Sequence, residues 1–192
     1  METQPTTDLD TLNKTLQAIL PKANSKRQLP PVESWNPPHT ADIGMEIRKD
    51  GSWWHQGTRF TREKLVALFS TILRKDDDGS TYLVTPYEKV MVHVEDAPFL
   101  GVRVDAATDK GETVIVVTTN LGDQVELDGD HPLRVEIDDE TQEPAPYLLV
   151  RGKLEAKLTR PAFYELVELA EERDGHLVVT SRGCEFDLGA ME

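Results

Sequence analysis

The chain has 192 residues, of which 35 are Asp or Glu and 21 are Lys or Arg, giving a formal net charge of −14 at pH 7. A chain this acidic repels phosphate backbones and anionic lipid surfaces, so we expect no nucleic-acid partner and no membrane partner. Its single cysteine, Cys184, permits no internal disulfide and no cysteine-rich metal site, and we expect no catalytic role for it.

The first segment predicts an amphipathic helix over residues 8–20, with Asp8 in the position of an N-cap. Its narrow apolar stripe would dock on the folded body, pair with another chain or fray. The stripe consists of Leu9, Leu12, Leu16 and Ile19.

Residues 1–8 have neither the basic start nor the apolar core of a secretion signal, and no apolar run is long enough to span a membrane, so we expect a soluble, cytoplasmic protein.

Residues 21–40 form the predicted connector. They contain five of the twelve prolines, which fix φ and push each preceding residue towards extended structure. Trp35 lies inside this segment. Because an indole is costly to leave in water, we expect the second half of the connector to lie on the folded body.

Residues 43–60 predict a β-hairpin, in which Trp53, Trp54 and His55 form the returning strand. Neighbouring strand residues face opposite ways, so one tryptophan can face the core and the other should be exposed or face a second domain. Two indoles, an imidazole and the Asp50 carboxylate crowd one tight turn, which is typical of a binding loop. The alternative is that these side chains only cover a second layer of the fold.

Two later segments repeat one pattern, each beginning with Thr-Arg, at Thr61 and at Thr159. The apolar residues that follow have the spacing of one face of an α-helix. Thr61 and Thr159 occupy N-cap positions, and Pro161 lies in the first turn, where its missing N–H costs nothing. The two apolar faces are Leu65, Leu68, Phe69 and Ile72, and Phe163, Leu166, Val167 and Ala170.

Each predicted helix lies between β-rich pieces with Asp-Gly or Gly turns, so we interpret the two segments as a duplicated strand–turn–helix–turn–strand motif. The alternative is two unrelated amphipathic helices. The residues between them predict further strands without helices, among them 113–119, whose β-branched residues suit a strand buried on both faces. We therefore expect an α+β fold with mostly antiparallel sheets, and Asp138–Pro146 as a second, acidic connector.

The sequence predicts that the chain divides into three segments. Residues 1–40 are an N-terminal helix with a proline-rich linker, residues 41–100 are an N-terminal α+β domain, and residues 101–192 are a C-terminal α+β domain.

Arg62 and Arg160 both follow the capping threonines. A helix N-terminus already carries partial positive charge, so a cation there usually has an acidic partner or an anionic ligand. If the two copies pack about a pseudo-two-fold axis, both arginines would face one interface. The alternative is surface salt bridges with nearby acids such as Glu63 and Glu165.

Recognised catalytic motifs are absent: the sequence contains no phosphate-binding loop, no dinucleotide-binding glycine pattern and no nucleophile elbow. The five histidines are not spaced as a helical zinc pair, so we predict no metal and no cofactor. Acid–base catalysis would fall to Glu88, His55 or His93, although a structural or solvent-facing role is the simpler interpretation of His93.

Five stretches form a recognisable signature: Asp-Gly-Ser-Trp-Trp-His-Gln-Gly (50–57), Arg-Glu-Lys-Leu-Val-Ala-Leu-Phe (62–69), Leu-Val-Thr-Pro-Tyr-Glu-Lys-Val (83–90), Val-Glu-Asp-Ala-Pro-Phe (94–99) and Thr-Asn (119–120). Together they resemble a bacterial family known as domain of unknown function 1285, over about residues 35–185. The resemblance implies a two-domain fold with a repeated motif, a C-terminal half superficially like a pleckstrin-homology barrel, and a ligand or signalling role at the interface between the halves. It implies no chemistry.

Our leading hypothesis is a non-enzymatic cytoplasmic ligand-binding or signalling module that uses the cleft between the two domains. Its partner would be an unknown small molecule or protein, held by aromatic contacts and bidentate arginines. One alternative is a small hydrolase or isomerase that uses Glu88, His55 or His93. Another is an interaction scaffold assembled through the N-terminal helix. The predicted ligand-binding residues are Trp53, Trp54, His55, Arg62, Glu88, Lys89 and Arg160.

Overall fold

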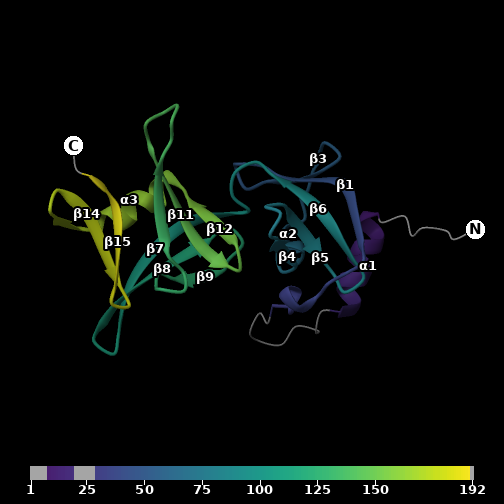
Figure 1. The fold of residues 1–192 in the computed structure, drawn as a ribbon, viewed down its shortest axis with the longest axis horizontal. Helices are drawn as coiled ribbons and strands as arrows, with labels where there is room; N and C mark the ends of the chain where they lie inside the picture. Colours follow the sequence, from purple (N-terminus) through teal and green to yellow (C-terminus); the bar gives the residue numbers. More distant parts are fainter. Residues whose placement is uncertain (1–7, 20–28, 191–192) are drawn as a thin grey trace, which may run out of the picture. The chain divides into compact units, whose positions relative to one another are not determined.

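The computed structural model describes residues 8–19 and 29–190, and the chain divides into two compact units, residues 1–95 and 96–192 (Figure 1). Each unit combines helix with strand, and most strand pairs are antiparallel, which confirms the predicted α+β class. Within the described residues, no helix is both long enough and apolar enough to cross a bilayer.

The first unit begins with helix α1 (Leu9–Ile19), as predicted. Asp8 caps it, because the backbone N–H of Thr11 donates to Asp8 Oδ1 at 2.7 Å. Leu12 and Leu16 are completely buried, so the chain itself covers the middle of the apolar stripe. Figure 1 draws α1 near β1 (His39–Ile47), and Asp8 and Leu9 border a hollow shared with that strand.

The described part of the connector, from residue 29 onwards, is held on the body through Arg74. It contains a short 3-10 helix, η1 (Val32–Ser34), whose carbonyl at Val32 accepts a hydrogen bond from Arg74 Nη1, as does the carbonyl of Trp35, both at 2.7 Å. Trp35 is half-buried. The expectation that the second half of the connector lies on the folded body is confirmed; residues 20–28 lie outside the described part of the chain.

One six-stranded sheet forms the centre of this unit, in the order β3-β2-β1-β6-β5-β4. The predicted hairpin is present as β1 and β2, with Met45 opposite His55. β1 also pairs in parallel with β6, so a strand that comes late in the unit lies beside its first strand. The remaining strands are β2 (Trp53–His55), β3 (Thr58–Arg59), β4 (Leu73–Lys75), β5 (Thr81–Val84) and β6 (Glu88–Val94).

Helix α2 (Glu63–Ser70) packs on this sheet through Phe69, whose ring stacks on Trp53 with centroids 6.4 Å apart. The helix starts later than predicted: Arg62 is the N-cap residue, with φ −90° and ψ 95°, so the prediction of a Thr61 cap is wrong. The helix also ends before Ile72, which is buried but lies in the turn to β4. Its apolar face is therefore rotated from the predicted one.

The second unit contains another six-stranded sheet, in the order β10-β11-β12-β7-β8-β9, and a three-stranded sheet, in the order β13-β14-β15. In the larger sheet β12 and β7 pair in parallel, and the other pairs are antiparallel. The strands are β7 (Phe99–Asp109), β8 (Glu112–Thr119), β9 (Gln124–Glu126), β10 (Leu133–Ile137), β11 (Pro144–Arg151), β12 (Leu154–Leu158), β13 (Glu171–Arg173), β14 (His176–Ser181) and β15 (Cys184–Ala190).

Helix α3 (Arg160–Glu168) follows β12 and packs on β7, with further contacts to β14 of the smaller sheet. Thr159 is its N-cap residue and Pro161 lies in its first turn, as predicted, although the Thr159 side chain makes no capping hydrogen bond. Glu165 accepts the backbone N–H of Val104 at 2.8 Å, just after the register shift between Gly101 and Arg103 in the pairing of β7 with β8. The helix is thus fixed to β7 next to an irregular point of that strand.

The predicted acidic connector Asp138–Pro146 is instead the end of a hairpin. β10 and β11 pair antiparallel on either side of residues 138–143, with Ile137 opposite Pro144. Pro144 and Pro146 belong to β11 itself. β11 lies between β10 and β12, but its pairing with β12 begins only at Tyr147, so both prolines precede the stretch of β11 that has a neighbour on each side.

The two helices lie in the same local order in both units: a hairpin, a helix, then a second hairpin. Alignment by the first helical residues, Glu63 and Arg160, places buried Phe69 on buried Leu166, and Val66 on Phe163. Alignment by the two Thr-Arg pairs is therefore one residue out of register. The burial pattern, rather than the Thr-Arg pair, is what the two helices share.

Candidate functional site

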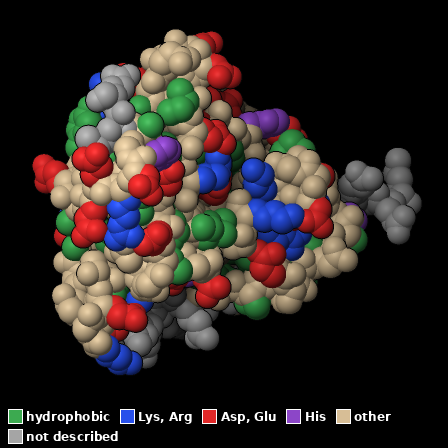
Figure 2. Space-filling view, turned by 60° about the vertical axis from the view of Figure 1, so that its left-hand side comes forward, with side chains coloured by type: hydrophobic (Ala, Val, Ile, Leu, Met, Phe, Trp, Pro, Cys, Tyr) green, Lys and Arg blue, Asp and Glu red, His purple; other side chains and the backbone are tan. Residues whose placement is uncertain are grey.

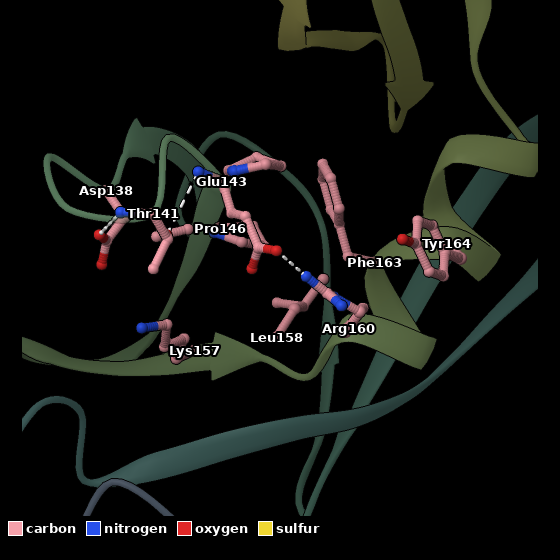
Figure 3. A pocket seen from close by; sticks show the side chains of 11 residues that line it. Asp138, Thr141, Glu143, Pro146, Lys157, Leu158, Arg160, Phe163 and Tyr164 are labelled. Atoms are coloured by element: carbon pink, nitrogen blue, oxygen red, sulfur yellow. Dashed lines mark hydrogen bonds and ion pairs between the residues drawn. The ribbon is translucent and has the colours of Figure 1, made fainter.

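A pocket of about 370 Å³ lies in the second unit, where the β10–β11 turn, the end of β12 and the start of α3 meet (Figure 3). Its size is within the range usual for small-molecule sites. The side chains around it combine carboxylates, two cations and an apolar surface. They are Asp138, Thr141, Glu143, Pro144, Ala145, Pro146, Lys157, Leu158, Arg160, Phe163 and Tyr164.

The turn that forms one wall is ordered by Asp138. Its Oδ1 accepts the backbone N–H groups of Thr141 at 2.8 Å and Glu140 at 2.9 Å. These two bonds stabilise the carboxylate and lower the pKa of Asp138 below its ordinary value. An aspartate followed by polar residues thus folds the turn locally and brings Glu143 to the mouth of the pocket.

Apolar residues form the remaining walls. β-strand alternation turns Leu158 inward at the end of β12, and the first turns of α3 supply Phe163; both are buried. Ala145 and Pro146 of β11 are also buried. Tyr164, by contrast, is exposed and lies at the rim, next to Arg160 in Figure 3.

Two cations lie on either side of Leu158 (Figure 3). Arg160 pairs with Glu143 across the mouth of the pocket, and this hydrogen bond to the carboxylate is the main reason that the pKa of Arg160 is raised. Lys157 Nζ donates to Asp96 Oδ2 at 2.7 Å. Burial disfavours the charged form of Lys157, but the contact with Asp96 outweighs it and raises the pKa of Lys157 above its ordinary value.

The pocket combines apolar walls with two paired cations. Each of the two cations already has a carboxylate partner, and none of the lining residues is a histidine, serine or cysteine that could act as a nucleophile with an adjacent base. Within the described residues, no group of three or more potential ligands is placed to hold a metal ion. A ligand with an apolar body and an anionic group would match the apolar walls and the rim cation.

Of the predicted ligand-binding residues, Arg160 alone lines this pocket. Its predicted acidic partner exists, but it is Glu143 rather than Glu165. Arg62 is exposed at the start of α2, and no ion pair with it occurs among the described residues.

The two tryptophans of β2 face opposite sides of the sheet, as predicted. Trp53 is buried in the core, and its Nε1 has no hydrogen-bond partner within the described residues. Trp54 is half-buried on the other face, where its Nε1–H donates to Ser52 Oγ at 2.8 Å and the Arg48 guanidinium lies 3.7 Å from its ring centroid. His55 is half-buried beside Phe60.

Lys89 belongs to a structural network. Its Nζ donates to Asp76 Oδ2 at 2.7 Å, which is the main reason that its pKa is raised, and it lies 4.2 Å from the Tyr82 ring centroid. Asp76 also accepts hydrogen bonds from Arg74, at 2.6 Å to the arginine Nε. Lys89 therefore helps to fix the β4–β5 turn.

The residues considered for acid–base chemistry are not brought together. Glu88 and His93 both lie on β6 at an odd separation, so their side chains point to opposite faces of the sheet. Glu88 is buried and its backbone bonds with Thr85. His93 is exposed and pairs with Asp42 at 2.9 Å, whereas His55 lies on the face opposite to His93.

Among the pocket residues that sequence reasoning missed are Glu143, Lys157 and Tyr164. Lys157 had a weak signal, because it lies in an alternating strand immediately before the Thr-Arg pair at 159. Glu143 was assigned to a connector, and only the pairing of β10 with β11 places it over α3.

On the face drawn in Figure 2, Lys and Arg side chains are interspersed with Asp and Glu side chains, without an extended basic area. Several charged side chains of the described residues are paired, as in the bonds of Arg134 to Glu155 and of Arg182 to Glu126. Arg160 with Glu143 follows the same pattern, and only its place at the pocket distinguishes it.

Comparison with known proteins gave two family models and two solved structures. "Domain of unknown function (DUF1285), N-terminal domain" matches residues 30–97, and "Protein of unknown function (DUF1285), C-terminal domain" matches residues 98–188. The crystal structure of a DUF1285 family protein from Silicibacter pomeroyi DSS-3 is 41% identical, covers 93% of this chain and 94% of that one, and has a TM-score of 0.82.

The crystal structure of a DUF1285 family protein from Shewanella baltica OS155 is 31% identical, with a TM-score of 0.53. That match covers 66% of this chain and 91% of the other. Among curated proteins, no match was found. The two family models together span residues 30–188, and so leave out α1.

Proposed function

The chain belongs to the DUF1285 family, which confirms the resemblance of its sequence motifs, and we propose that it acts as a non-enzymatic ligand-binding or signalling module. The single observation that carries this proposal is the pocket at the start of α3, where Arg160 stands at the mouth of an apolar hollow. The ligand is a small molecule or a peptide end with an anionic group and an apolar body.

Arg160 is suited to receive the anionic group. A guanidinium presents a planar fork of donors that matches a carboxylate in two parallel hydrogen bonds. Its present partner, Glu143, holds it in an exposed ion pair, and exposed pairs contribute at most about 1 kcal/mol. A ligand carboxylate can therefore replace Glu143 at little cost, while Leu158 and Phe163 contact the apolar body.

Two earlier alternatives gain no support from the geometry. The acid–base alternative uses Glu88, His55 or His93, and His93 lies on the face of the sheet opposite to the other two. Glu88 and His55 share a face but lie at different points along β1, opposite His39 and Met45. The scaffold alternative needs a free apolar stripe on α1, and Leu12 and Leu16 are completely buried. Binding in a cleft between the two units, with Trp53, Trp54, His55, Arg62, Glu88 and Lys89, stays a prediction. We place the module in the cytoplasm, because one cysteine offers no internal disulfide for an oxidising compartment.

The test compares two probes of nearly equal shape, phenylpropionate and its uncharged amide, phenylpropionamide. Phenylpropionate should raise the melting temperature and perturb the NMR signals of Leu158 and Phe163, whereas the amide should do so much less. In Arg160→Ala, which removes a charge-assisted contact, affinity for phenylpropionate should fall by about tenfold or more.

Arg103→Ala is the matched control. Arg103 is exposed to nearly the same extent as Arg160, 58% against 60%, and also pairs with an exposed carboxylate, Asp105. This variant should bind phenylpropionate like the unchanged protein. If the acid and the amide bind equally, or if the two variants behave alike, Arg160 is not the anion contact and the proposal fails.

A further inference from the structure

The chain passes from the first unit to the second between Glu95 and Asp96. Glu95 is fastened to the first unit at two points. Its backbone N–H donates to the carbonyl oxygen of Ile47 at 2.9 Å, and its Oε2 accepts the backbone N–H of Lys49 at 2.8 Å. The last residue of the first unit is therefore held by the β1–β2 hairpin.

Asp96 is fastened to the second unit in the same manner. Its Oδ1 accepts the hydroxyl hydrogen of Tyr147 at 2.9 Å, and its Oδ2 accepts a hydrogen from Lys157 Nζ at 2.7 Å. Tyr147 and Lys157 lie opposite each other on β11 and β12, so the two donors form one cross-strand pair. Ala97 and Phe99 after Asp96 are buried. Asp96 is thus the last exposed residue before the chain enters β7.

The contact between Asp96 and Lys157 leads directly to the pocket, because Lys157 lines it. The Lys157 side chain therefore lines the pocket and also donates to Asp96, the first residue of the second unit. The pair is partly exposed, 31% for Lys157 and 24% for Asp96, so water can replace either partner at modest cost. A ligand carboxylate held by Arg160 would also attract the Lys157 ammonium on the other side of Leu158, and would so compete with Asp96 for its N–H donors.

We propose that Asp96 couples occupancy of the pocket to the point where the chain passes between its two units: an anionic ligand draws Lys157 away from Asp96 and loosens Asp96 and Ala97. The inference rests on the proposed function and adds its regulation. Asp96 is a positioning residue, since it acts on the ligand only through Lys157. A binding event at α3 thereby changes the mobility of the junction, which is a response that a partner protein could detect.

The contact is tested without a ligand by Lys157→Met, which keeps the length of the side chain and removes its charge. Nitrogen-relaxation NMR should show backbone order at Asp96 and Ala97 falling from about 0.85 towards about 0.6. Order at Glu95 should not change, because its bonds to Ile47 and Lys49 remain. Asp96→Asn, which still accepts from Tyr147, should produce a smaller fall.

Lys110→Met is the control, since Lys110 is an exposed lysine in the β7–β8 turn and does not line the pocket. It should leave order at Asp96 and Ala97 unchanged. Phenylpropionate added to the unchanged protein should lower order at these two residues, and should add nothing in Lys157→Met. Phenylpropionamide should have no effect.

The failures of the two proposals are distinguishable. If Lys157→Met leaves Asp96 as ordered as before, or if bound phenylpropionate does so, the coupling is overturned while binding in the pocket stands. If phenylpropionate does not bind, the proposed function falls instead, and with it the trigger of the coupling.

Discussion

In the first unit the hairpin after helix α2 joins the same sheet as the hairpin before it, whereas in the second unit the hairpin after α3 joins a separate three-stranded sheet. The two segments have the same order of elements and similar buried positions on their helices. What differs is the partner of the second hairpin: β5 pairs with β6, which returns to β1, while β14 pairs with β15. A shared local pattern therefore does not determine long-range strand pairing.

This difference has a consequence for the site. β11 has β10 on its outer side, and the β10–β11 turn reaches the start of α3 and closes a pocket there. The corresponding strand of the first unit, β1, pairs instead with β6, and Arg62 is not a lining residue of this pocket. Arg62 is the N-cap residue of α2 and Arg160 the first residue of α3, so the two arginines have different surroundings.

The largest expected effect tests which residues are equivalent in the two helices. Phe69→Ala should reduce the free energy of unfolding by about 4 kcal/mol and Leu166→Ala by about 3 kcal/mol, because both side chains are completely buried. Val167→Ala, the partner of Phe69 in the Thr-Arg alignment, should cost only about 1 kcal/mol, since Val167 is half-buried. Urea unfolding of the three variants measures this.

A cost for Val167→Ala equal to that of Leu166→Ala would show that the Thr-Arg alignment is the correct one. Val167, rather than Leu166, would then be the residue of α3 equivalent to Phe69.

A second test concerns how each second hairpin is anchored. Asp76 in the β4–β5 turn is partly buried, which disfavours its carboxylate, but the hydrogen bonds from Arg74 and Lys89 outweigh this and lower the pKa of Asp76. Because the folded-state pKa is lowered, this stabilisation is complete above the unfolded value of about 3.9 and is lost as the pH falls through the lower folded value. Asp76→Asn should cost about 2 kcal/mol at neutral pH and less in acid.

Thermal unfolding between neutral and strongly acidic pH measures this dependence. Asp174→Asn is the control in the β13–β14 turn: Asp174 is exposed and has φ 52°, a conformation that Asn adopts readily. It should change stability little at any pH. An equal pH dependence in both variants would contradict the proposed difference in anchoring.

The smallest expected effect compares the two arginines directly. Arg62→Ala and Arg160→Ala should each leave the free energy of unfolding almost unchanged, because both side chains are exposed. Calorimetry measures both. A large loss in Arg160→Ala alone would mean that its pair with Glu143 stabilises the fold, and the binding experiment would need a gentler variant.

Much of the fold followed from local pattern. Alternation predicted the strand around Val90 and Val92, and the β-branched run at 113–119 predicted β8. Helical spacing with Asp8 predicted α1. These signals depend on residues close in sequence, and the structure keeps them because burial of one face reinforces each local preference.

The rest depended on contacts between distant residues. The predicted start of α2 was wrong because it relied on a capping side chain. Arg62 is the N-cap residue by its extended backbone conformation, and no side chain caps the helix with a hydrogen bond. The pocket was missed because the prolines near Glu143 suggested a linker, whereas pairing of β10 with β11 makes them part of a strand. Lys157 contacts Asp96 because β12 pairs in parallel with β7, and this pairing cannot be predicted from residues that are close in sequence.

The parallel pairs β1–β6 and β12–β7 also matter for how the protein is made. During synthesis β1 leaves the ribosome before residues 88–94, so one edge of β1 stays unpaired until those residues are made. One edge of β7 likewise stays unpaired until β12 is made. Contacts of such long sequence separation slow folding and leave strand edges open in the nascent chain. Neither half of the polypeptide can be completed from its beginning, so each must remain unfinished until its later strand has been synthesised.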